Sequence, residues 1–186
     1  MLFECMIHSS GKETAMHCHR VGEYARIFLS KDSLGYSKEE VDCIVKGASY
    51  HDIGKAKIDK NILYKSGGLT DEEFEMIKQH SVIGYEILME NSNLLTEQEK
   101  EICSKIVLLH HKRIDGGGYP QTEDDIPLYV QLISILDAFD ALTSERCYQK
   151  SRSREEALTM IRDGKCGGKM NEELIEKVSK FIDKVL

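Results

Sequence analysis

Residues 41–55, VDCIVKGASYHDIGK, decide how the chain folds. Their apolar side chains recur at the spacing of one face of an α-helix, at Val41, Ile44, Val45 and Ala48. Asp52 comes four residues after Ala48 and therefore stays on this inward face, directly after His51. An ionised carboxylate on a buried helix face is costly unless it is paired or binds a metal. The stretch therefore predicts a core helix that carries a His-Asp pair into the interior.

Helix signals recur in the rest of the chain, whereas strand-like alternation is nearly absent. Three segments carry a capping box, in which side chain and backbone satisfy each other at a helix start: Thr70 with Glu73, Thr96 with Glu99, and Ser153 with Glu156. Pro127 fits the first turn of a further helix. Residues 111–126, HKRIDGGGYPQTEDDI, contain three consecutive glycines and are expected to form a loop. The fold class that we expect is an all-α bundle of about seven helices with one glycine-rich loop.

Further polar side chains share helix faces with apolar residues: His80 with Ile83 and Ile87, His110 beside His111 with Ile102 and Ile106, and Asp137 with Ile133. A lone inward histidine is usually a hydrogen-bonded core residue. Several such residues on separate helices would each need a partner of their own, whereas a common centre satisfies all of them at once. The pattern therefore predicts a buried polar site where these helices meet.

The residue types predict the chemistry of that site. Imidazole nitrogen mixed with carboxylate oxygen, without thiolate, suits iron or manganese, with zinc and nickel as alternatives. Two ions close together can hold the attacking and leaving oxygens of a phosphoryl displacement. Glu13 and His17 also share a helix face, although this spacing alone is typical of an exposed surface pair. From the residues, we expect a buried metal centre that performs hydrolysis.

The composition limits the other possibilities. A chain of 186 residues suits one domain with its own core, which we place at 1–186. The net charge of −7 argues against binding to DNA or RNA polymers, which requires a basic surface. No apolar run approaches the roughly 20 residues of a membrane span, and no secretion signal precedes Glu13, so we expect a cytoplasmic protein without membrane contact. Six singly scattered cysteines are expected to remain thiols: Cys5, Cys18, Cys43, Cys103, Cys147 and Cys166.

Five segments resemble, in the expected order from about residue 13 to the C-terminus, the HD-GYP family of HD-domain metal-dependent phosphohydrolases. They are Glu13-Thr14 with His17 and Arg20-Val21 (ETxxHxxRV), the His51-Asp52 doublet with Lys55, residues 69–88, His110-His111 with Asp115 to Pro120 (HHExxDGxGYP), and residues 133–148. A single His-Asp doublet is weak support, but the five segments together are specific. The resemblance implies a helical HD domain that acts as a cyclic di-GMP phosphodiesterase.

The family pattern also implies a role for each matching residue. The metal ligands would be His17, His51, Asp52, His80, His110, His111 and Asp137, with Glu13 completing a third metal position that only some members have. A hydroxide activated by the two or three metal ions would attack phosphorus, giving pGpG and onward GMP. Asp52 and Lys55 would be catalytic. The substrate contacts would be Lys55, Arg146, Lys150, and Gly118, Tyr119 and Pro120 of the glycine-rich loop.

Several positions depart from the family pattern. Lys112 stands where the family usually has Glu, which weakens the expected support of the metal ligands. Ile114 and Cys147 replace a usual Trp and Pro, and Gln149 replaces a basic residue. Lys150 or Lys112 is expected to make the missing phosphate contact.

These departures leave alternatives to the enzyme open. The domain is also compatible with a non-catalytic signalling module that binds cyclic di-GMP, or a diguanylate cyclase through the GYP loop. Within the same chemistry, the substrate could be a related cyclic dinucleotide such as cyclic GMP-AMP. A general HD nucleotidase that acts on mononucleotides is disfavoured by the GYP loop.

Overall fold

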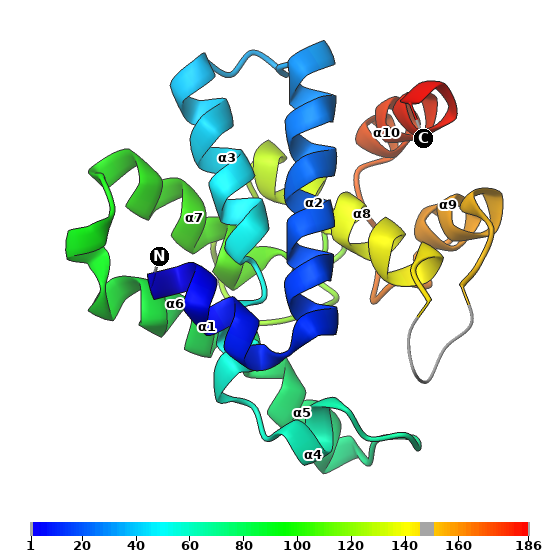
Figure 1. Cartoon of the computed structure of the whole chain (residues 1–186). Helices are drawn as coiled ribbons and strands as arrows, with labels where there is room; N and C mark the ends of the chain where they lie inside the picture. Colours follow the sequence, from blue (N-terminus) through cyan, green and yellow to red (C-terminus); the bar gives the residue numbers. More distant parts are fainter. Residues whose placement is uncertain (1, 146–150, 186) are drawn as a thin grey trace.

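The computed structural model describes residues 2–145 and 151–185, which form an assembly of helices (Figure 1). In chain order these are α1 Leu2–Ser10, α2 Lys12–Lys31, α3 Lys38–Tyr50, the 3₁₀ helix η1 Ile53–Lys57, α4 Lys60–Leu63, α5 Asp71–Lys78, α6 His80–Glu90, the 3₁₀ helix η2 Ser92–Leu94, α7 Glu97–Leu109, α8 Leu128–Thr143, α9 Arg154–Arg162 and α10 Glu172–Val185. Within the described ranges no strand is present, and one isolated bridge joins Lys112 to Gly118. The predicted all-α class is confirmed.

The described residues contain ten α-helices, which is more than the expected number of about seven. The additional segments are short, because α1 has nine residues and α4 has four. Gln79 also separates α5 from α6 within residues 69–88, which the family resemblance implies to be one helix. At this point the imidazole of His80 donates to the carbonyl of Ile77 at 2.7 Å. In an uninterrupted helix this carbonyl would accept only from a main-chain amide.

Helix starts follow the predicted capping chemistry closely. The three expected capping boxes begin α5, α7 and α9, and a fourth, Ser37 with Glu40, begins α3. Pro127 lies one position before the place we expected, because α8 begins at Leu128. Its carbonyl still accepts the first hydrogen bond of that helix, from the amide of Gln131 at 3.1 Å.

Two apolar clusters hold the helices together. The larger one is built around α8, where Leu132, Ile133 and Leu136 are fully buried and which packs against α2, α7, α9 and α10. The smaller one joins α1, η1, α6 and α7 and contains Ile53 and Leu88. Figure 1 shows α2 and α3 side by side, with α9 and α10 beyond α8 and with α4 and α5 projecting at one end. Five buried polar residues lie on, or directly after, helices that contribute to these clusters: His17, His51, His80, His110 and Asp137.

Among the described helices, none is long and apolar enough to cross a membrane.

Candidate metal centre

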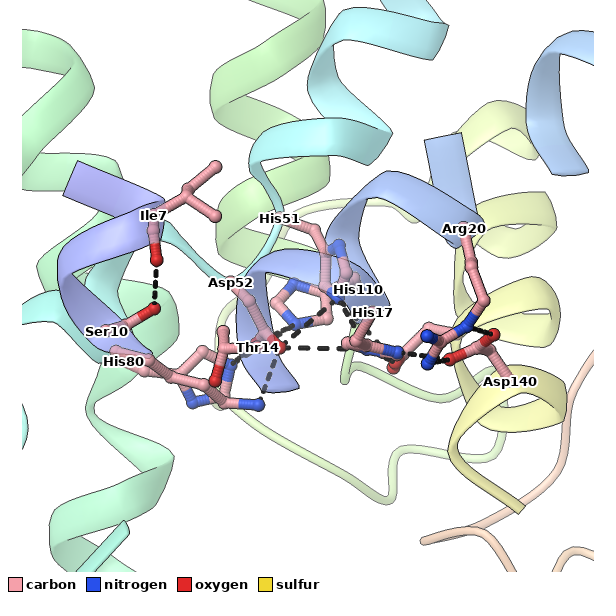
Figure 2. A network of polar contacts seen from close by, with 12 residues as sticks. Ile7, Ser10, Thr14, His17, Arg20, His51, Asp52, His80, His110 and Asp140 are labelled. Atoms are coloured by element: carbon pink, nitrogen blue, oxygen red, sulfur yellow. Dashed lines mark hydrogen bonds and ion pairs between the residues drawn. The ribbon is translucent and has the colours of Figure 1, made fainter. Parts of the chain in front are cut away.

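Most of the predicted polar residues lie at helix ends. His51 is the C-cap residue directly after α3 and Asp52 follows it, His80 begins α6, and His110 is the C-cap residue directly after α7. These four residues are buried, with at most 1% of each exposed. His17 in α2 and Asp137 in α8 instead lie within their helices, and they are buried as well. Figure 2 shows the side chains of His17, His51, His80 and His110 converging on Asp52.

The donor atoms form two adjoining groups. Nitrogen and oxygen atoms of His17, His51 and Asp137 all lie within 4.8 Å of one another, and we call this set the α2 group. The same holds for Asp52, His80, His110 and His111, which we call the α7 group. The structure therefore brings together seven of the eight residues predicted as metal ligands.

Asp52 faces both groups, one carboxylate oxygen towards each. Its Oδ1 lies 3.2 Å from His80 Nε2 and 4.0 Å from His110 Nε2. Its Oδ2 lies 3.5 Å from His51 Nε2 and 3.7 Å from His17 Nε2. A carboxylate in this position can bridge two cations, because each oxygen offers a lone pair to a different one.

Main-chain carbonyls fix the orientation of three imidazole rings. Nδ1 of His51 lies 2.7 Å from the carbonyl of Ala48, and Nδ1 of His80 lies 2.7 Å from that of Ile77. Nδ1 of His110 lies 3.0 Å from the carbonyl of Val107. A carbonyl can only accept, so each Nδ1 carries the proton and each Nε2 keeps its lone pair.

Nε2 lone pairs of neighbouring imidazoles face each other, and a cation between them would remove this repulsion. His80 Nε2 lies 3.3 Å from His110 Nε2, and both of these rings carry their proton on Nδ1. Two unprotonated nitrogens cannot hydrogen-bond to each other, and buried Asp52 Oδ1 has no hydrogen-bond partner. Both observations fit divalent cations held between these atoms, as in other sites of mixed imidazole and carboxylate donors.

The electrostatics keep the histidines of the α7 group neutral. Burial lowers the pKa of His80 to about 4 and brings the pKa of His110 and His111 well below the usual value. Burial acts to raise the pKa of Asp52, but the positive charge of Lys55 acts against it, and the pKa lies well below its usual range. At neutral pH the group therefore offers neutral imidazoles and an ionised carboxylate, the forms that bind metals.

Lys55 lies at the edge of the centre, and its predicted catalytic role stays a prediction. It stands on η1, and its Nζ donates to Asp52 Oδ2 at 2.6 Å. The side chain is 16% exposed, so the ammonium group lies between the buried carboxylate and solvent. A phosphoryl oxygen that approached the centre from this side would meet its positive charge.

Glu13 is the predicted ligand that the structure does not bring into either group. It lies in the first turn of α2 and lines a cavity of about 300 Å³ together with His17, Arg20 and Ser144. The third metal position at Glu13 therefore stays a prediction.

The GYP loop lies against the second of the two adjacent histidines. The ring of Tyr119 packs on that of His111 with centroids 4.5 Å apart, and its amide donates to the His111 carbonyl at 3.2 Å. Gly118 has a φ of +74°, and a Cβ there would lie 1.9 Å from the same carbonyl. This glycine therefore allows the close approach of the loop to His111. The predicted contacts of Gly118, Tyr119 and Pro120 with a nucleotide stay predictions.

Lys112 points away from the metal-binding groups. Its Nζ donates to the carbonyl and the hydroxyl of Thr122, at 2.6 and 3.1 Å, and to the carbonyl of Asp124. The residue that replaces the usual glutamate thus ties the segment after the GYP loop to the end of α7. This use of its donors does not support the expectation that Lys112 compensates for a missing phosphate contact.

Two neighbouring residues hold the loop from its other side, and we had assigned neither of them a role. Arg113 is buried and donates to the carbonyls of His110 and Cys166, both at 3.0 Å. Asp115 accepts from the amides of Gly117 at 3.0 Å and Lys169 at 2.8 Å. The GYP loop is therefore joined to the connection between α9 and α10.

Asp140 is the functional residue that sequence reasoning missed. It lies one helical turn after Asp137 on α8, is fully buried, and is 2.7 Å from His17 Nδ1 through its Oδ2. Arg20 donates to both oxygens of this carboxylate (Figure 2). Burial acts to lower the pKa of His17, but the hydrogen bonds to Asp137 and Asp140 raise it. The spacing of Asp137 and Asp140 was the available signal, since residues three apart share a helix face.

Cys18 is buried beside the centre, where its sulfur could join a third group with His51 and Asp52. Burial raises the pKa of the Cys18 thiol well above its ordinary value, so it stays protonated and is a poor ligand. Cys43 and Cys103 are buried, Cys166 is half-buried and Cys5 is exposed. All five are free thiols, as expected, and Cys147 lies outside the described residues.

The predicted phosphate contacts Arg146 and Lys150 lie outside the described residues, as does Gln149. Their roles stay predictions.

Comparisons with known proteins identify the family. A family model described as HD domain matches residues 6–170. The chain is 37% identical over 171 residues to a cyclic di-GMP phosphodiesterase of Thermotoga maritima, covering 91% of this chain and 45% of that protein. It is 32% identical over 181 residues to the 3'3'-cGAMP-specific phosphodiesterase 2 of Vibrio cholerae, covering 95% and 34%. The chain thus spans less than half the length of these curated relatives.

Solved structures show the same fold. Bd1817, described as a HDG"Y"P protein from Bdellovibrio bacteriovorus, superposes with a TM-score of 0.71 at 18% identity, covering 91% of this chain and 52% of that one. The HD domain of the L. monocytogenes phosphodiesterase PgpH gives a TM-score of 0.64 at 16% identity and covers 98% of both chains. Together with the sequence matches, these findings confirm the family predicted from the motifs: the chain belongs to the HD-domain family and is of the HD-GYP type.

Proposed function

We propose that this chain is a metal-dependent phosphodiesterase that hydrolyses cyclic di-GMP to linear pGpG and, with a third ion at Glu13, onward to GMP. The observation that carries the proposal is the placement of Asp52, which faces the α2 group with one oxygen and the α7 group with the other. This arrangement fits two ions in one buried centre. The relatives named cyclic di-GMP phosphodiesterases supply the substrate class.

The proposed cofactors are two or three divalent ions, with iron or manganese favoured by the imidazole and carboxylate donors and with zinc or nickel as alternatives. The α2 and α7 groups would each hold one ion, and Asp52 would contact both. When bound, such ions lower the pKa of a water molecule and neutralise charge on phosphoryl oxygens.

The protein's own side chains would orient the substrate. Lys55 holds its ammonium group 2.6 Å from Asp52, where it can also contact a phosphoryl oxygen and stabilise the charge that develops there. Arg146 would grip a phosphate through its planar guanidinium, with Lys150 as a second cation. Tyr119 packs one side of its ring against His111, so it would bind a guanine base only through its remaining surface.

The test is turnover by protein loaded without air with Fe(II) or Mn(II), followed by chromatography with mass detection of pGpG and GMP. We expect product from the wild type and none above background from Asp52→Asn. Asp42→Asn is the matched control, because Asp42 lies on α3 as an exposed partner of Lys38. If the fully loaded wild type binds cyclic di-GMP but does not hydrolyse it, the chain is a signalling module and not an enzyme.

The relatives also raise a second substrate. The relative named as a 3'3'-cGAMP-specific phosphodiesterase is 32% identical over 95% of this chain, against 37% over 91% for the cyclic di-GMP phosphodiesterase of T. maritima. The same assay with cyclic GMP-AMP and with mononucleotides separates these substrates by their relative kcat/KM values. A diguanylate cyclase as a partner of the GYP loop stays a prediction, which a pull-down with the loaded wild type would check.

A further inference from the structure

The two histidine positions of the α2 group are supported in different ways. His51 lies at a helix end, where the carbonyl of Ala48 is available to its Nδ1. His17 lies inside the 20-residue helix α2, whose interior carbonyls are engaged in the main-chain ladder. The partner of its Nδ1 comes from another helix, and it is the carboxylate of Asp140 on α8 at 2.7 Å.

Asp140 is itself held by a second contact from α2. Nε of Arg20 donates to Asp140 Oδ1 at 2.7 Å, and Nη2 donates to Oδ2 at 2.8 Å. Arg20 lies three residues after His17, so both side chains leave α2 on the same side. The fork-shaped guanidinium keeps the fully buried carboxylate ionised and fixes its plane.

An ionised carboxylate can only accept, so Asp140 requires a proton on His17 Nδ1, and Asp137 Oδ1, 2.9 Å from Nε2, accepts from Nε2 as long as no cation lies between them. A cation held by the α2 group would need the lone pair of Nε2, and Asp140 would then keep the one remaining proton of the ring on Nδ1. Hydrogen bonding to a carboxylate also makes an imidazole a stronger electron donor to a metal.

We propose that Asp140 and Arg20 are positioning residues for the α2 group: Asp140 selects the Nδ1–H tautomer of His17, and Arg20 holds Asp140. The inference rests on the proposed metal centre, and it concerns one of its two positions. The α7 group has no contact with this pair among the described hydrogen bonds and ion pairs, so it keeps its own ion when the pair is disrupted.

Asp140→Asn tests the tautomer directly because the side chain keeps its shape. The amide oxygen can still accept from Arg20, whereas the amide nitrogen donates to His17 Nδ1 and moves the proton to Nε2. Long-range ¹H–¹⁵N spectra of the metal-free proteins should show a proton on His17 Nδ1 in the wild type, with or without a second proton on Nε2 towards Asp137, and a proton on Nε2 alone in Asp140→Asn. A wild type without a proton on Nδ1, or an Asp140→Asn that keeps it, would overturn the proposal.

Metal binding gives the second readout, measured as ions per chain and as Kd for Mn(II). We expect Asp140→Asn to weaken one of two ions by about 10- to 100-fold and to leave the other unchanged. Arg20→Lys should lie between the wild type and Arg20→Met, because it keeps the charge but loses the fork. Glu23→Gln is the matched control, since Glu23 forms an exposed pair with Arg26 on the same helix.

The outcomes separate this proposal from the proposed function. Two ions bound by Asp140→Asn with wild-type Kd values would overturn the positioning role while leaving the metal centre intact. Equal loss of both ions, together with a lower Tm of the metal-free protein, would make the pair a determinant of the fold instead. A wild type that binds no metal would contradict the proposed function, and the tautomer of His17 would still decide the role of Asp140.

Discussion

The histidines of the α7 group and His17 of the α2 group are oriented by different means. In the α7 group, His80 and His110 stand at helix ends, and their Nδ1 atoms bond to carbonyls three residues earlier in the chain. In the α2 group, His17 depends on Asp137 and Asp140, which are 120 and 123 residues away. Helix ends leave carbonyls without main-chain partners, so a histidine there can be oriented locally. A histidine inside a helix needs a partner that only tertiary packing supplies.

The largest expected effect comes from the residue that serves both groups. Asp52→Asn removes one negative charge between two ions and leaves an amide nitrogen that cannot act as a ligand, so both ions should bind weakly. We expect turnover to fall on the order of 10³-fold or more, the scale on which removing an essential catalytic group acts. Steady-state kinetics with metal content measured on the same sample checks this. Retention of both ions and of activity would mean that Asp52 is not shared.

The second effect tests the α7 group alone through the GYP loop. Gly118→Ala combines a φ of +74° with a Cβ that would lie 1.9 Å from the carbonyl of His111. Gly116→Ala has a similar φ of +83° but nothing within 4 Å of the Cβ, so it isolates the strain of the backbone. We expect unfolding free energies lowered by about 1 kcal/mol for Gly116→Ala and by about 2–3 kcal/mol for Gly118→Ala. Equal losses in urea unfolding would show that the close approach is unimportant.

The third and smallest effect is the response of the metal-free chain to acid. The folded chain keeps His80 neutral because burial lowers its pKa from 6.5 to about 4, and the pKa of His110 and His111 is lowered too. The unfolded chain takes up these protons below about pH 6.5. This contribution to stability is therefore complete above pH 6.5 and is lost as the pH falls towards 4. Urea unfolding across this window measures it.

His80→Gln is the variant that sharpens the acid experiment. It removes one of the lowered pKa values, so the decline in stability between pH 6.5 and 4 should become shallower. His19→Gln is the control, because His19 is exposed on α2. A decline that is the same in all three proteins would place the acid sensitivity outside the α7 group.

The sequence predicted the α7 group more completely than the α2 group. The apolar spacing predicted that His80 and His110 lie on inward faces. Their rings are then oriented by carbonyls three residues earlier in the chain, which needs no distant partner. Asp140 carried the same signal as Asp137, but its burial, its contact with His17 and its pairing with Arg20 depend on how α2 and α8 pack. The packing of α2 against α8 cannot be predicted from the spacing of residues in a single sequence. Lys112 shows the same limit, because its bonds to Thr122 and Asp124 depend on the path of the loop.

The helix count failed for a related reason. The apolar periodicity continues through residues 69–88 and therefore does not predict that the helix is interrupted at Gln79. The four-residue α4 is too short to produce a periodic pattern. Capping boxes performed better, because they depend on residues three apart in the chain and need no distant partner.

The number and coupling of ions bound by the wild type test the central claim most directly. Metal analysis of Mn(II)-loaded protein should give at least two ions per chain. Its electron paramagnetic resonance spectrum should show two magnetically coupled ions, because Asp52 would join the α2 and α7 groups through one carboxylate. A single ion per chain, or two ions with the spectrum of isolated Mn(II), would contradict a shared centre.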